Sequence, residues 1–260
     1  MKALVTGGAG FIGSNLVDKL VKKGHKVIVL DNLSTGNLSN LSQVKKKIKF
    51  VKIDISKDEK SLYKYFKNID WVFHMAGLAD MISSLINPKK YFQSNFIGTR
   101  NILNAARKSK IKKFVYAASA SCYGKPKNIP TSEKGQIKTL SPYARTKRRA
   151  EEIIMKKAFK EKFSAISLRF FNVYGPRSTA KSSYSSVISI FYKQKLKNKP
   201  LTVVGDGLQT RDFIHVSDVV SAMIKAAQSK VHNQVFNVGA QKAVNINIIA
   251  KLFRGKKKYI

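Results

Sequence analysis

A glycine-rich segment near the start of the chain limits the possible folds more strongly than any other feature. Residues 6–13 read Thr-Gly-Gly-Ala-Gly-Phe-Ile-Gly, directly after a short apolar run and directly before a stretch with helical spacing. In such a strand-turn-helix, glycines permit the tight turn, let the backbone approach a pyrophosphate and let the helix pack closely on the strand. The pyrophosphate then lies at the positively polarised helix N-terminus. We therefore expect Gly7, Gly10, Phe11, Ile12 and Gly13 to bind a dinucleotide.

An acidic residue at the end of the second apolar run indicates which dinucleotide binds. Asp31 follows the run from Lys26 to Leu30, and the acidic residue of such sites comes about 20 residues after the glycines. A carboxylate there accepts hydrogen bonds from the adenosine ribose and repels a 2′-phosphate. Asp31 therefore predicts NAD rather than NADP.

Short apolar runs alternate with helix-like segments through the first two thirds of the chain. We expect strands at Lys2 to Thr6, Lys26 to Leu30, Lys49 to Ile53, Trp71 to Met75, Lys113 to Ala118 and Ala165 to Phe170. We expect helices at Ser14 to Lys23, Pro88 to Lys108 and Ser141 to Glu161, the last opening with a Ser-Pro pair that suits a helix start. This rhythm is typical of an α/β protein with a Rossmann-type, doubly wound parallel sheet.

The rhythm changes after about Asn172, which indicates a second, smaller lobe. A polar loop at residues 174–183 precedes an expected helix at 185–197 and expected short strands at 201–204 and 213–216. Residues 217–229 and 234–238 are expected to return to the first sheet. We therefore expect an NAD-binding Rossmann domain at residues 1–172, joined by residues 212–240, and a substrate-binding lobe at residues 173–211 and 241–260.

The composition is that of an ordinary globular protein apart from its charge. Of the 260 residues 43% are hydrophobic, but no apolar stretch approaches the roughly 18 residues that a membrane span needs. The single cysteine, Cys122, favours a reducing compartment, so we expect a cytoplasmic location. Lys and Arg number 50 against 14 Asp and Glu, a formal net charge of +36. Because the basic residues are scattered along the chain, we expect them to attract anionic substrates but no specific nucleic acid.

Seven motifs occur in an order that resembles the extended short-chain dehydrogenases/reductases, within them the NAD-dependent epimerase/dehydratase family, over nearly the whole chain. They are Thr-Gly-x-x-Gly-x-x-Gly at 6–13, Asp-Asn-Leu-Ser-Thr-Gly at 31–36, Asp-Ile at 54–55, His-Met-Ala-Gly at 74–77, Asn-x-x-Gly-Thr at 95–99, Tyr-Ala-Arg-Thr-Lys at 143–147 and Arg-Phe-Phe-Asn-Val-Tyr-Gly-Pro-Arg at 169–177. The resemblance implies that NAD also contacts Asn32, Asp54, Ile55, Ala76, Gly77, Asn95, Tyr143, Lys147 and Phe171.

Tyr143 and Lys147 form a candidate catalytic pair. They stand at i and i+4 of an expected helix and so share one face, where the ammonium can lower the pKa of the phenol from its usual value of about 10. Bound NAD⁺ adds a second positive charge. The tyrosinate can then take the proton from a sugar hydroxyl while hydride leaves the same carbon for the nicotinamide. Ser119, at the end of a strand, resembles the third catalytic member of the family, which hydrogen-bonds the reacting oxygen.

The resemblance implies epimerisation of a nucleotide sugar, most like that of UDP-glucose or UDP-N-acetylglucosamine 4-epimerases. Oxidation at the fourth sugar carbon gives a ketone, the ketopyranose turns over within the site, and reduction from the opposite face regenerates NAD in place. Such a site grips the nucleotide firmly and the sugar loosely. The resemblance also implies a homodimer and a UDP-linked substrate. The implied substrate-binding residues are Asn172, Val187, Ile188, Thr202 and Arg211, the last pairing with the diphosphate.

Two alternatives stay open. Dehydratases and sugar-acid decarboxylases of the family usually carry Glu where this chain has Ser121, and the aspartate of the dehydratases is replaced by Ala120. Elimination of water therefore lacks an acid, which favours epimerisation or another nucleotide-sugar oxidoreduction over a dehydratase. The second alternative is a non-catalytic NAD-binding regulator, although such proteins commonly lose the tyrosine or the lysine that this chain retains.

The C-terminal end and a few single residues complete the expectations. Family members usually continue beyond the point where this chain stops, with an arginine that grips the diphosphate, so we expect a shortened substrate lobe. His74 and His215 lie in apolar surroundings and are expected to be structural rather than metal ligands, and no metal site is expected. Cys122 is expected to be a packed core thiol.

Overall fold

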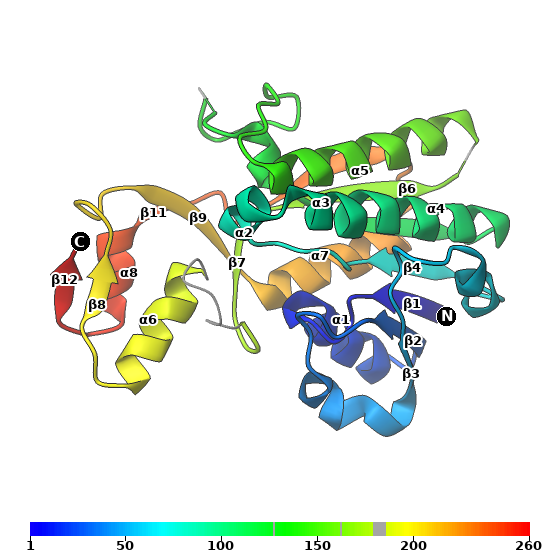
Figure 1. Cartoon of the computed structure of the whole chain (residues 1–260), viewed down its shortest axis with the longest axis horizontal. Coiled ribbons are helices and arrows are strands. Elements are labelled where there is room, and N and C mark those ends of the chain that lie inside the picture. Colours follow the sequence, from blue (N-terminus) through cyan, green and yellow to red (C-terminus); the bar gives the residue numbers. More distant parts are fainter. Residues whose placement is uncertain (127, 162, 179–185) are drawn as a thin grey trace.

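A seven-stranded parallel sheet forms the centre of the protein (Figure 1). The computed structural model describes residues 1–126, 128–161, 163–178 and 186–260. The strand order is β10-β6-β5-β4-β1-β2-β3, and each neighbouring pair is parallel, so the expected Rossmann-type sheet is confirmed. The strands are β1 (Lys2–Thr6), β2 (Lys26–Asp31), β3 (Ile48–Lys52), β4 (Trp71–His74), β5 (Lys113–Ser119), β6 (Ala165–Phe170) and β10 (Gln234–Val238).

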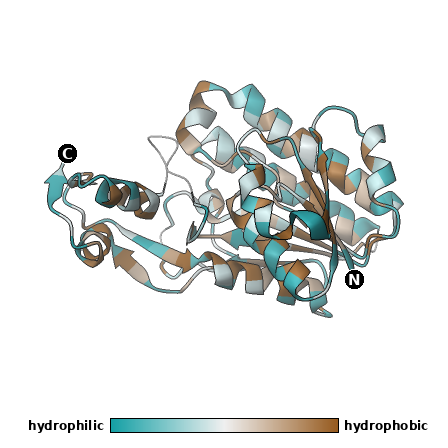
Figure 2. Ribbon diagram, turned by 90° about the horizontal axis from the view of Figure 1, so that it is seen from below, coloured by the Kyte–Doolittle hydropathy of each residue, from teal (hydrophilic) through white to brown (hydrophobic). Residues whose placement is uncertain are grey.

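Two hydrophobic cores lie on opposite faces of this sheet. Successive side chains of a strand point to opposite faces, so Val5 and Val29 enter one core while Leu4 and Ile28 enter the other. Figure 2 shows the apolar strands between helices whose outer faces are hydrophilic. The first core is covered by α1 (Phe11–Lys22) and α7 (Val216–Gln228), the second by α4 (Gly98–Lys108) and α5 (Pro142–Lys160). No helix in the described ranges is both long enough and apolar enough to cross a membrane.

The order of the strands creates a crevice at one edge of the sheet. β1 lies between β4 and β2; the chain continues from β1 to β2 and β3 on one side, and from β4 to β5 and β6 on the other. Connections that leave in opposite directions open a gap at the carboxyl ends of the two inner strands, where α/β sheets of this kind bind ligands. The glycine segment follows β1, and the loop with Ala76 and Gly77 follows β4.

The helical segments differ in detail from those expected. The helix expected over residues 88–108 is present but not uniform, because a π-helical turn interrupts it; such turns are frequent at functional sites. α5 begins as expected: the side chain of Ser141 accepts a hydrogen bond from the backbone N–H of Ala144 at 3.2 Å, and Pro142 occupies the first turn. The further helical segments are η1 (Leu38–Lys47), η2 (Lys60–Tyr65), α2 (Met81–Ile86), α3 (Pro88–Tyr91), the π-helical η3 (Phe92–Ile97) and η4 (Ala120–Tyr123).

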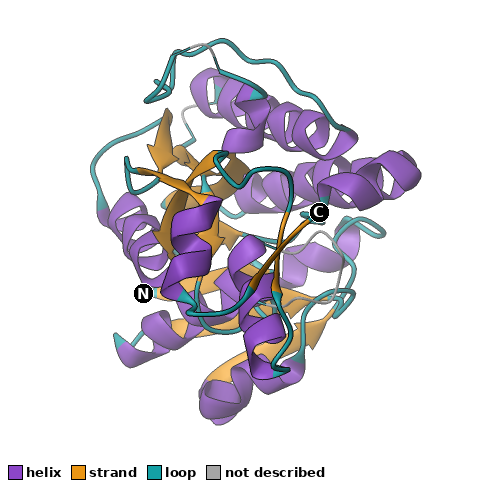
Figure 3. Ribbon diagram, turned by 90° about the vertical axis from the view of Figure 1, so that its left-hand side faces the viewer, coloured by secondary structure: helices purple, strands orange, loops and turns teal. Residues whose placement is uncertain are grey.

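A smaller lobe follows β6 and has its own core. Figure 3, seen from the side of this lobe, shows its helices and strands in front of the central sheet. Its elements are β7 (Asn172–Tyr174), α6 (Val187–Leu196), β8 (Leu201–Val203), β9 (Thr210–His215), β11 (Ala243–Asn245), α8 (Ile246–Leu252) and β12 (Lys257–Tyr259). Phe191, Leu201, Val203 and Ile249 are buried together at its centre. Strands β7, β9 and β11 form one small sheet, and β8 and β12 form another.

Part of the expected second lobe lies outside the described residues. The polar loop expected at residues 174–183 and the start of the helix expected at 185–197 extend into residues 179–185, and α6 begins at Val187. The strand expected at 213–216 starts earlier, at Thr210, and ends at His215, where α7 begins. Residues 234–238 return to the large sheet as β10 and pair with β6.

Candidate active site

The glycine segment forms a tight turn between β1 and α1. Gly7 has a φ of 67°, and a Cβ at this position would lie 2.7 Å from the backbone nitrogen of Ala76. A Cβ at Gly13 would collide with the carbonyl oxygen of Gly7, so α1 packs directly on the turn. Gly10 is the N-cap of α1, and no described side chain caps it. The first N–H groups of the helix are therefore available to a pyrophosphate, as Phe11 and Ile12 were expected to provide.

Asp31 holds the glycine segment against the end of β2. Its side chain is buried; Oδ2 accepts a hydrogen bond from the N–H of Ala9 at 2.9 Å and Oδ1 accepts one from Leu33 at 2.8 Å. Each carboxylate oxygen has a second lone pair, so Asp31 can still accept bonds from a ribose. Neighbouring Asn32 is exposed and donates to Asp54 Oδ2 at 3.3 Å.

Asp54 and Ile55 follow β3 beside this adenosine end of the crevice. Burial raises the pKa of Asp54, but hydrogen bonds from the backbone and hydroxyl of Ser56 and from Asn32 outweigh it, and the net pKa lies below its usual value. Ile55 is buried, and its side chain would touch a Cβ placed at Gly98, the first residue of α4. Asp54 is thus linked through Asn32 to the end of β2, whereas Ile55 packs on the start of α4.

Asn95 supports the loop after β4 rather than reaching openly into the crevice. It is buried within the π-helical turn; Oδ1 accepts a bond from the N–H of Leu78 at 2.7 Å, and Nδ2 donates to Leu78 O at 3.0 Å and to Thr146 Oγ1 at 3.2 Å. A Cβ at Gly77 would lie 3.0 Å from Asn95 Oδ1. Asn95 thus ties the Ala76-Gly77 loop to the helix that carries the catalytic pair.

Ser119 and Tyr143 meet at the carboxyl end of β5. The hydroxyl of Ser119 forms a hydrogen bond with the side chain of Tyr143. Ser119 Oγ also lies 2.8 Å from Ser121 Oγ and accepts a bond from the N–H of Ser121 at 3.2 Å. The backbone N–H of Tyr143 donates to Ser84 Oγ of α2 at 3.1 Å. The structure therefore brings these two predicted catalytic residues into direct contact.

Lys147 lies one turn further along α5 and is buried. Its ammonium lies 4.4 Å from the ring centre of Tyr116, over the ring face, and 3.9 Å from where a Cβ of Gly77 would stand. Burial lowers the pKa of Lys147 to about 7, although the negative charge of Glu151 opposes this. Lys147 therefore lies next to the Ala76-Gly77 loop.

The sequence predicts that Lys147 lowers the pKa of Tyr143. For the groups of the protein alone, without the cofactor, this prediction is wrong. Burial raises the pKa of Tyr143 above its usual value, and the hydrogen bond with Ser119 only partly offsets that increase. The sequence argument assumed a fully charged lysine. Because burial brings the pKa of Lys147 to about 7, the lysine loses much of its charge near neutral pH.

The surroundings of His74, His215 and Cys122 indicate structural roles. His74 is fully buried, with its ring nitrogens 2.7 Å from Thr6 Oγ1 and 2.8 Å from Thr99 Oγ1, and burial lowers its pKa to about 3. His215 caps α7. Burial raises the pKa of Cys122 to about 11, so it is not an activated thiol. In the described part of the chain no group of three or more His, Cys, Asp or Glu residues could hold a metal ion.

The predicted substrate-binding residues are spread over the junction and the small lobe. Asn172 on β7 donates from Nδ2 to Asp212 O at 2.9 Å. Just before it, the N–H of Phe171 donates to Val238 O at 3.1 Å, which seats Phe171 beside β10. Arg211 on β9 is exposed, and its Nη1 donates to Thr210 O at 2.8 Å.

The other three lie among the packing contacts of the small lobe. Val187 and Ile188 begin α6 and pack, partly buried, against the small core. Thr202 on β8 binds Gln194 of α6 twice, through Oγ1 at 2.7 Å and through its N–H at 3.2 Å. The structure therefore shows no contact of these three with the catalytic residues.

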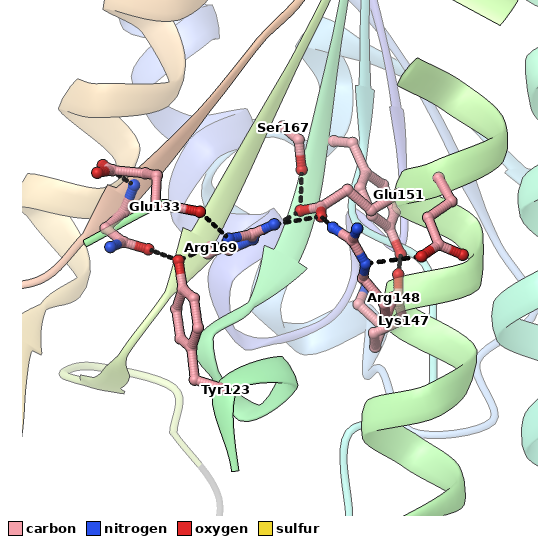
Figure 4. A network of polar contacts seen from close by, with 10 residues as sticks. Tyr123, Glu133, Lys147, Arg148, Glu151, Ser167 and Arg169 are labelled. Atoms are coloured by element: carbon pink, nitrogen blue, oxygen red, sulfur yellow. Dashed lines mark hydrogen bonds and ion pairs between the residues drawn. The ribbon is translucent and has the colours of Figure 1, made fainter. Parts of the chain in front are cut away.

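The sequence pattern did not predict the ion pair between Glu151 of α5 and Arg169 of β6 (Figure 4). Arg169 of β6 donates to both carboxylate oxygens of Glu151, from Nη2 at 2.7 Å and from Nε at 3.0 Å. Ser167 Oγ donates to Glu151 Oε2 at 2.8 Å, Arg148 forms a second ion pair, and Arg169 Nη1 donates to Tyr123 OH at 2.6 Å. Glu151 stands at i+4 from Lys147, so this spacing could have indicated that the two residues share a helix face, but not that Glu151 pairs with Arg169.

A basic cavity lies away from these residues. It encloses about 430 Å³ at the amino edge of the sheet, near the starts of β1 and β2, and is lined by Lys2, Lys26, Lys47, Lys49, Lys64, Lys67 and neighbouring residues. The basic residues are thus less evenly scattered than the sequence suggested. None of the predicted catalytic residues lines this cavity.

Comparisons with known proteins agree with this geometry. The model of the NAD dependent epimerase/dehydratase family matches residues 3–239. A putative UDP-glucose 4-epimerase of Methanocaldococcus jannaschii is 40% identical over 98% of this chain and 84% of its own. A UDP-N-acetyl-alpha-D-glucosaminuronate decarboxylase of Bacillus cytotoxicus is 36% identical over 96% of this chain and 78% of its own.

Among solved structures, a UDP-glucose 4-epimerase of Thermotoga maritima with UDP-glucose is 34% identical and has a TM-score of 0.94, over 100% of this chain and 85% of its own. The family match covers the glycine segment, Ser119, Tyr143 and Lys147. The chain belongs to the NAD dependent epimerase/dehydratase family.

Proposed function

We propose that this protein interconverts the two configurations of a nucleotide sugar at its fourth sugar carbon, with NAD as a cofactor that stays bound. The substrates are UDP-glucose and UDP-galactose or the corresponding N-acetyl pair. One observation carries the proposal: Ser119 is hydrogen-bonded to Tyr143, and Lys147 is buried one helical turn away, at the carboxyl edge of the sheet beside the glycine turn.

The turn after β1 has the close backbone approach and the N–H donors that suit the pyrophosphate of NAD. The glycine turn leaves no room for a Cβ at Gly7 or Gly13, and the uncapped start of α1 points its N–H groups at the pyrophosphate position. Asp31, at the end of β2, would accept hydrogen bonds from the ribose hydroxyls. When bound, NAD⁺ supplies the two-electron acceptor for oxidation of the sugar and returns the electrons in the second half of the cycle.

Tyr143 acts as the base and then as the acid. Its phenolate oxygen takes the proton of the sugar hydroxyl, with Ser119 donating a hydrogen bond to the reacting oxygen, and the same proton returns when the ketone is reduced. Its pKa is raised in the protein, so the positive charges of Lys147 and of the nicotinamide are needed to favour the phenolate. Lys147 would hold the nicotinamide ribose of NAD and would supply this charge.

The substrate must be held at its nucleotide end. Arg211 is exposed on β9 and carries a positive charge suited to the diphosphate. Asn172 lies at the junction between β6 and the small lobe, where a sugar can face Tyr143. In this proposal, Val187, Ile188 and Thr202 belong to a wall of α6 and β8 on the nucleotide side, and residues 173–211 and 241–260 form the substrate lobe; the support is the family resemblance.

Dehydration and decarboxylation fit the site less well. Ser121 stands where relatives with those activities usually carry a glutamate, and its hydroxyl is engaged with Ser119 at 2.8 Å. Ala120 supplies no acid. The decarboxylase relative from Bacillus cytotoxicus makes the corresponding sugar acid the second substrate to test.

Incubation with single UDP sugars tests the proposal. Purified protein is given UDP-glucose, UDP-N-acetylglucosamine or a UDP-linked uronic acid without added NADH, and the products are resolved by chromatography. We expect galacto-configured product from at least one neutral sugar and no release of carbon dioxide from the acid. Binding of NAD without conversion of any sugar would instead favour a non-catalytic regulator.

Tyr143→Phe provides the matched check on the mechanism. We expect loss of turnover with NAD binding retained, because the phenol oxygen is the only atom removed. Tyr65→Phe makes the same change at the amino edge of the sheet, where the large cavity lies, and should leave turnover unchanged. Retained turnover in Tyr143→Phe would contradict the assigned base.

We further propose a cytoplasmic homodimer. The support is the family resemblance and the single, buried Cys122, a thiol that needs no oxidising compartment. Light scattering coupled to size-exclusion chromatography measures the assembly directly, and a mass of one chain would contradict it.

A further inference from the structure

The charge of Lys147 depends on very few neighbours. Its ammonium faces the ring of Tyr116 on β5 and the imidazole of His74 on β4, and Tyr143 shares its helix. Burial raises the pKa of Tyr116 well above its usual value and lowers that of His74 to about 3, so both are neutral near pH 7. Among the acidic groups of the described chain, Glu151 is the one whose negative charge raises the pKa of Lys147.

Glu151 is held in an ionised form close behind this lysine. It follows Lys147 by one turn of α5, on the same face, and its side chain is 2% exposed. Burial raises the pKa of Glu151, but the hydrogen bonds and charge of Arg169, together with Ser167 and Arg148, outweigh burial and lower it below its usual value. The carboxylate therefore keeps its negative charge.

Glu151 makes more polar contacts than the packing of α5 on the sheet requires. A buried ion pair is a weak source of stability compared with apolar residues of the same volume. Here two guanidinium groups and one hydroxyl converge on one carboxylate, and that carboxylate stands one turn from the only buried amine at the reacting centre. We propose that Glu151 is a positioning residue that keeps the Lys147 ammonium charged at the site, a role that rests on the proposed epimerase function.

Glu151→Gln tests this with almost no change of volume. The substitution removes the negative charge and leaves the charges of Arg169 and Arg148 in place, so the pKa of Lys147 falls. We expect a decrease of about one unit. The alkaline limb of kcat/KM, where activity is lost as Lys147 deprotonates, moves to lower pH by the same amount, about tenfold in rate on that limb. KM for the nucleotide sugar stays unchanged, since Glu151 contacts no substrate.

Titration of Lys147 by NMR gives a readout that needs no turnover. In protein labelled with ¹³C at the lysine Cε, an amine that titrates near pH 7 separates from ordinary lysines, which titrate near pH 10. Lys147→Met identifies the signal. If the unsubstituted protein converts no nucleotide sugar, the proposed function fails, but the NMR titration still shows whether Glu151 sets the charge of Lys147.

Two further variants make the test decisive. Glu152→Gln removes the same charge from the next residue of α5, whose side chain is 52% exposed and also binds Arg148; we expect no shift of either readout. Arg148→Gln, at a half-buried side chain, should raise the pKa of Lys147 by roughly a few tenths of a unit, and it decides the matter if Glu151→Gln does not fold. Equal shifts in Glu151→Gln and Glu152→Gln, or a fall in Arg148→Gln, would overturn the proposal.

Discussion

The backbones of Gly7 and Ala76 approach so closely that a single methyl group cannot fit between them. A Cβ at Gly7 would stand 2.7 Å from the nitrogen of Ala76, and Gly7 has a φ of 67°. This contact joins the turn after β1 to the loop after β4, the two segments that form the crevice at the carboxyl edge of the sheet.

Gly7→Ala should therefore weaken both the fold and the grip on NAD. The left-handed backbone alone costs about 1–2 kcal/mol, and the collision with Ala76 adds to it. The free energy of unfolding and an NAD titration measure the two effects. Gly24→Ala is the matched control, because Gly24 has a φ of 77° but nothing within 4 Å of its Cβ position. It should show the backbone cost with NAD affinity unchanged; equal losses of NAD affinity in both variants would contradict the argument.

The free energy of unfolding should decrease as the pH is lowered, because His74 is buried as the neutral imidazole. The pKa of His74 is about 3 in the folded protein, against 6.5 for a histidine outside the folded structure. The contribution to stability is thus complete above pH 6.5 and is lost as pH falls toward 3, at about 1.4 kcal/mol per unit. Urea unfolding at several pH values measures the slope. His74→Asn should flatten this slope, whereas His232→Asn, at an exposed position, should leave it; an unchanged slope in His74→Asn would be the contrary result.

Ser119→Ala should lower kcat by roughly 10²-fold and move the acid limb of the rate profile to higher pH. The reason is that the hydrogen bond from Ser119 lowers the pKa of Tyr143, which burial raises. Steady-state rates across pH give both numbers. Ser121→Ala removes a hydroxyl two residues away and should cost only a few-fold; a larger effect at Ser121 would assign the bond to the wrong serine.

Tyr123→Phe should destabilise the protein by about 1–3 kcal/mol. Its hydroxyl accepts from Arg169 Nη1 at 2.6 Å and donates to Asn237 Oδ1 at 2.7 Å, so its removal takes this partner from one buried and one half-buried polar group. Chemical denaturation provides the measurement. Tyr192→Phe, at a side chain that is 59% exposed, should stay within about 0.5 kcal/mol, and a similar loss there would argue against the buried network.

Local spacing explains which features were predictable. The glycine turn, the end of β2 at Asp31, and the pair Tyr143 and Lys147 each lie within a few consecutive residues, so their geometry follows from one turn or one helix. Ser119 was proposed from the family resemblance, and its place at the end of β5 follows from the end of an apolar run. These expectations needed no knowledge of packing between distant segments.

Features that join distant segments were missed. The bonds of Asn95 to Leu78 depend on a π-helical turn that no residue pattern announced. Arg169 meets Glu151 only because β6 lies under α5. The pKa of Tyr143 was misjudged because the burial of its phenol depends on how the surrounding elements pack. In the small lobe, β8 and β12 pair across more than fifty positions of sequence, which residue patterns do not reveal.

The π-helical turn also changes the direction in which the side chains that follow it point. Each residue advances an α-helix by about 100°, so the extra residue in the turn at 92–97 rotates everything after it relative to everything before it. With the offset, Asn95 faces Leu78 while Thr99 faces His74. A one-residue deletion in the turn would give a more regular helix and point one of these two side chains away from its partner. The π-helical turn therefore lets one helical segment bind both the loop after β4 and the central sheet.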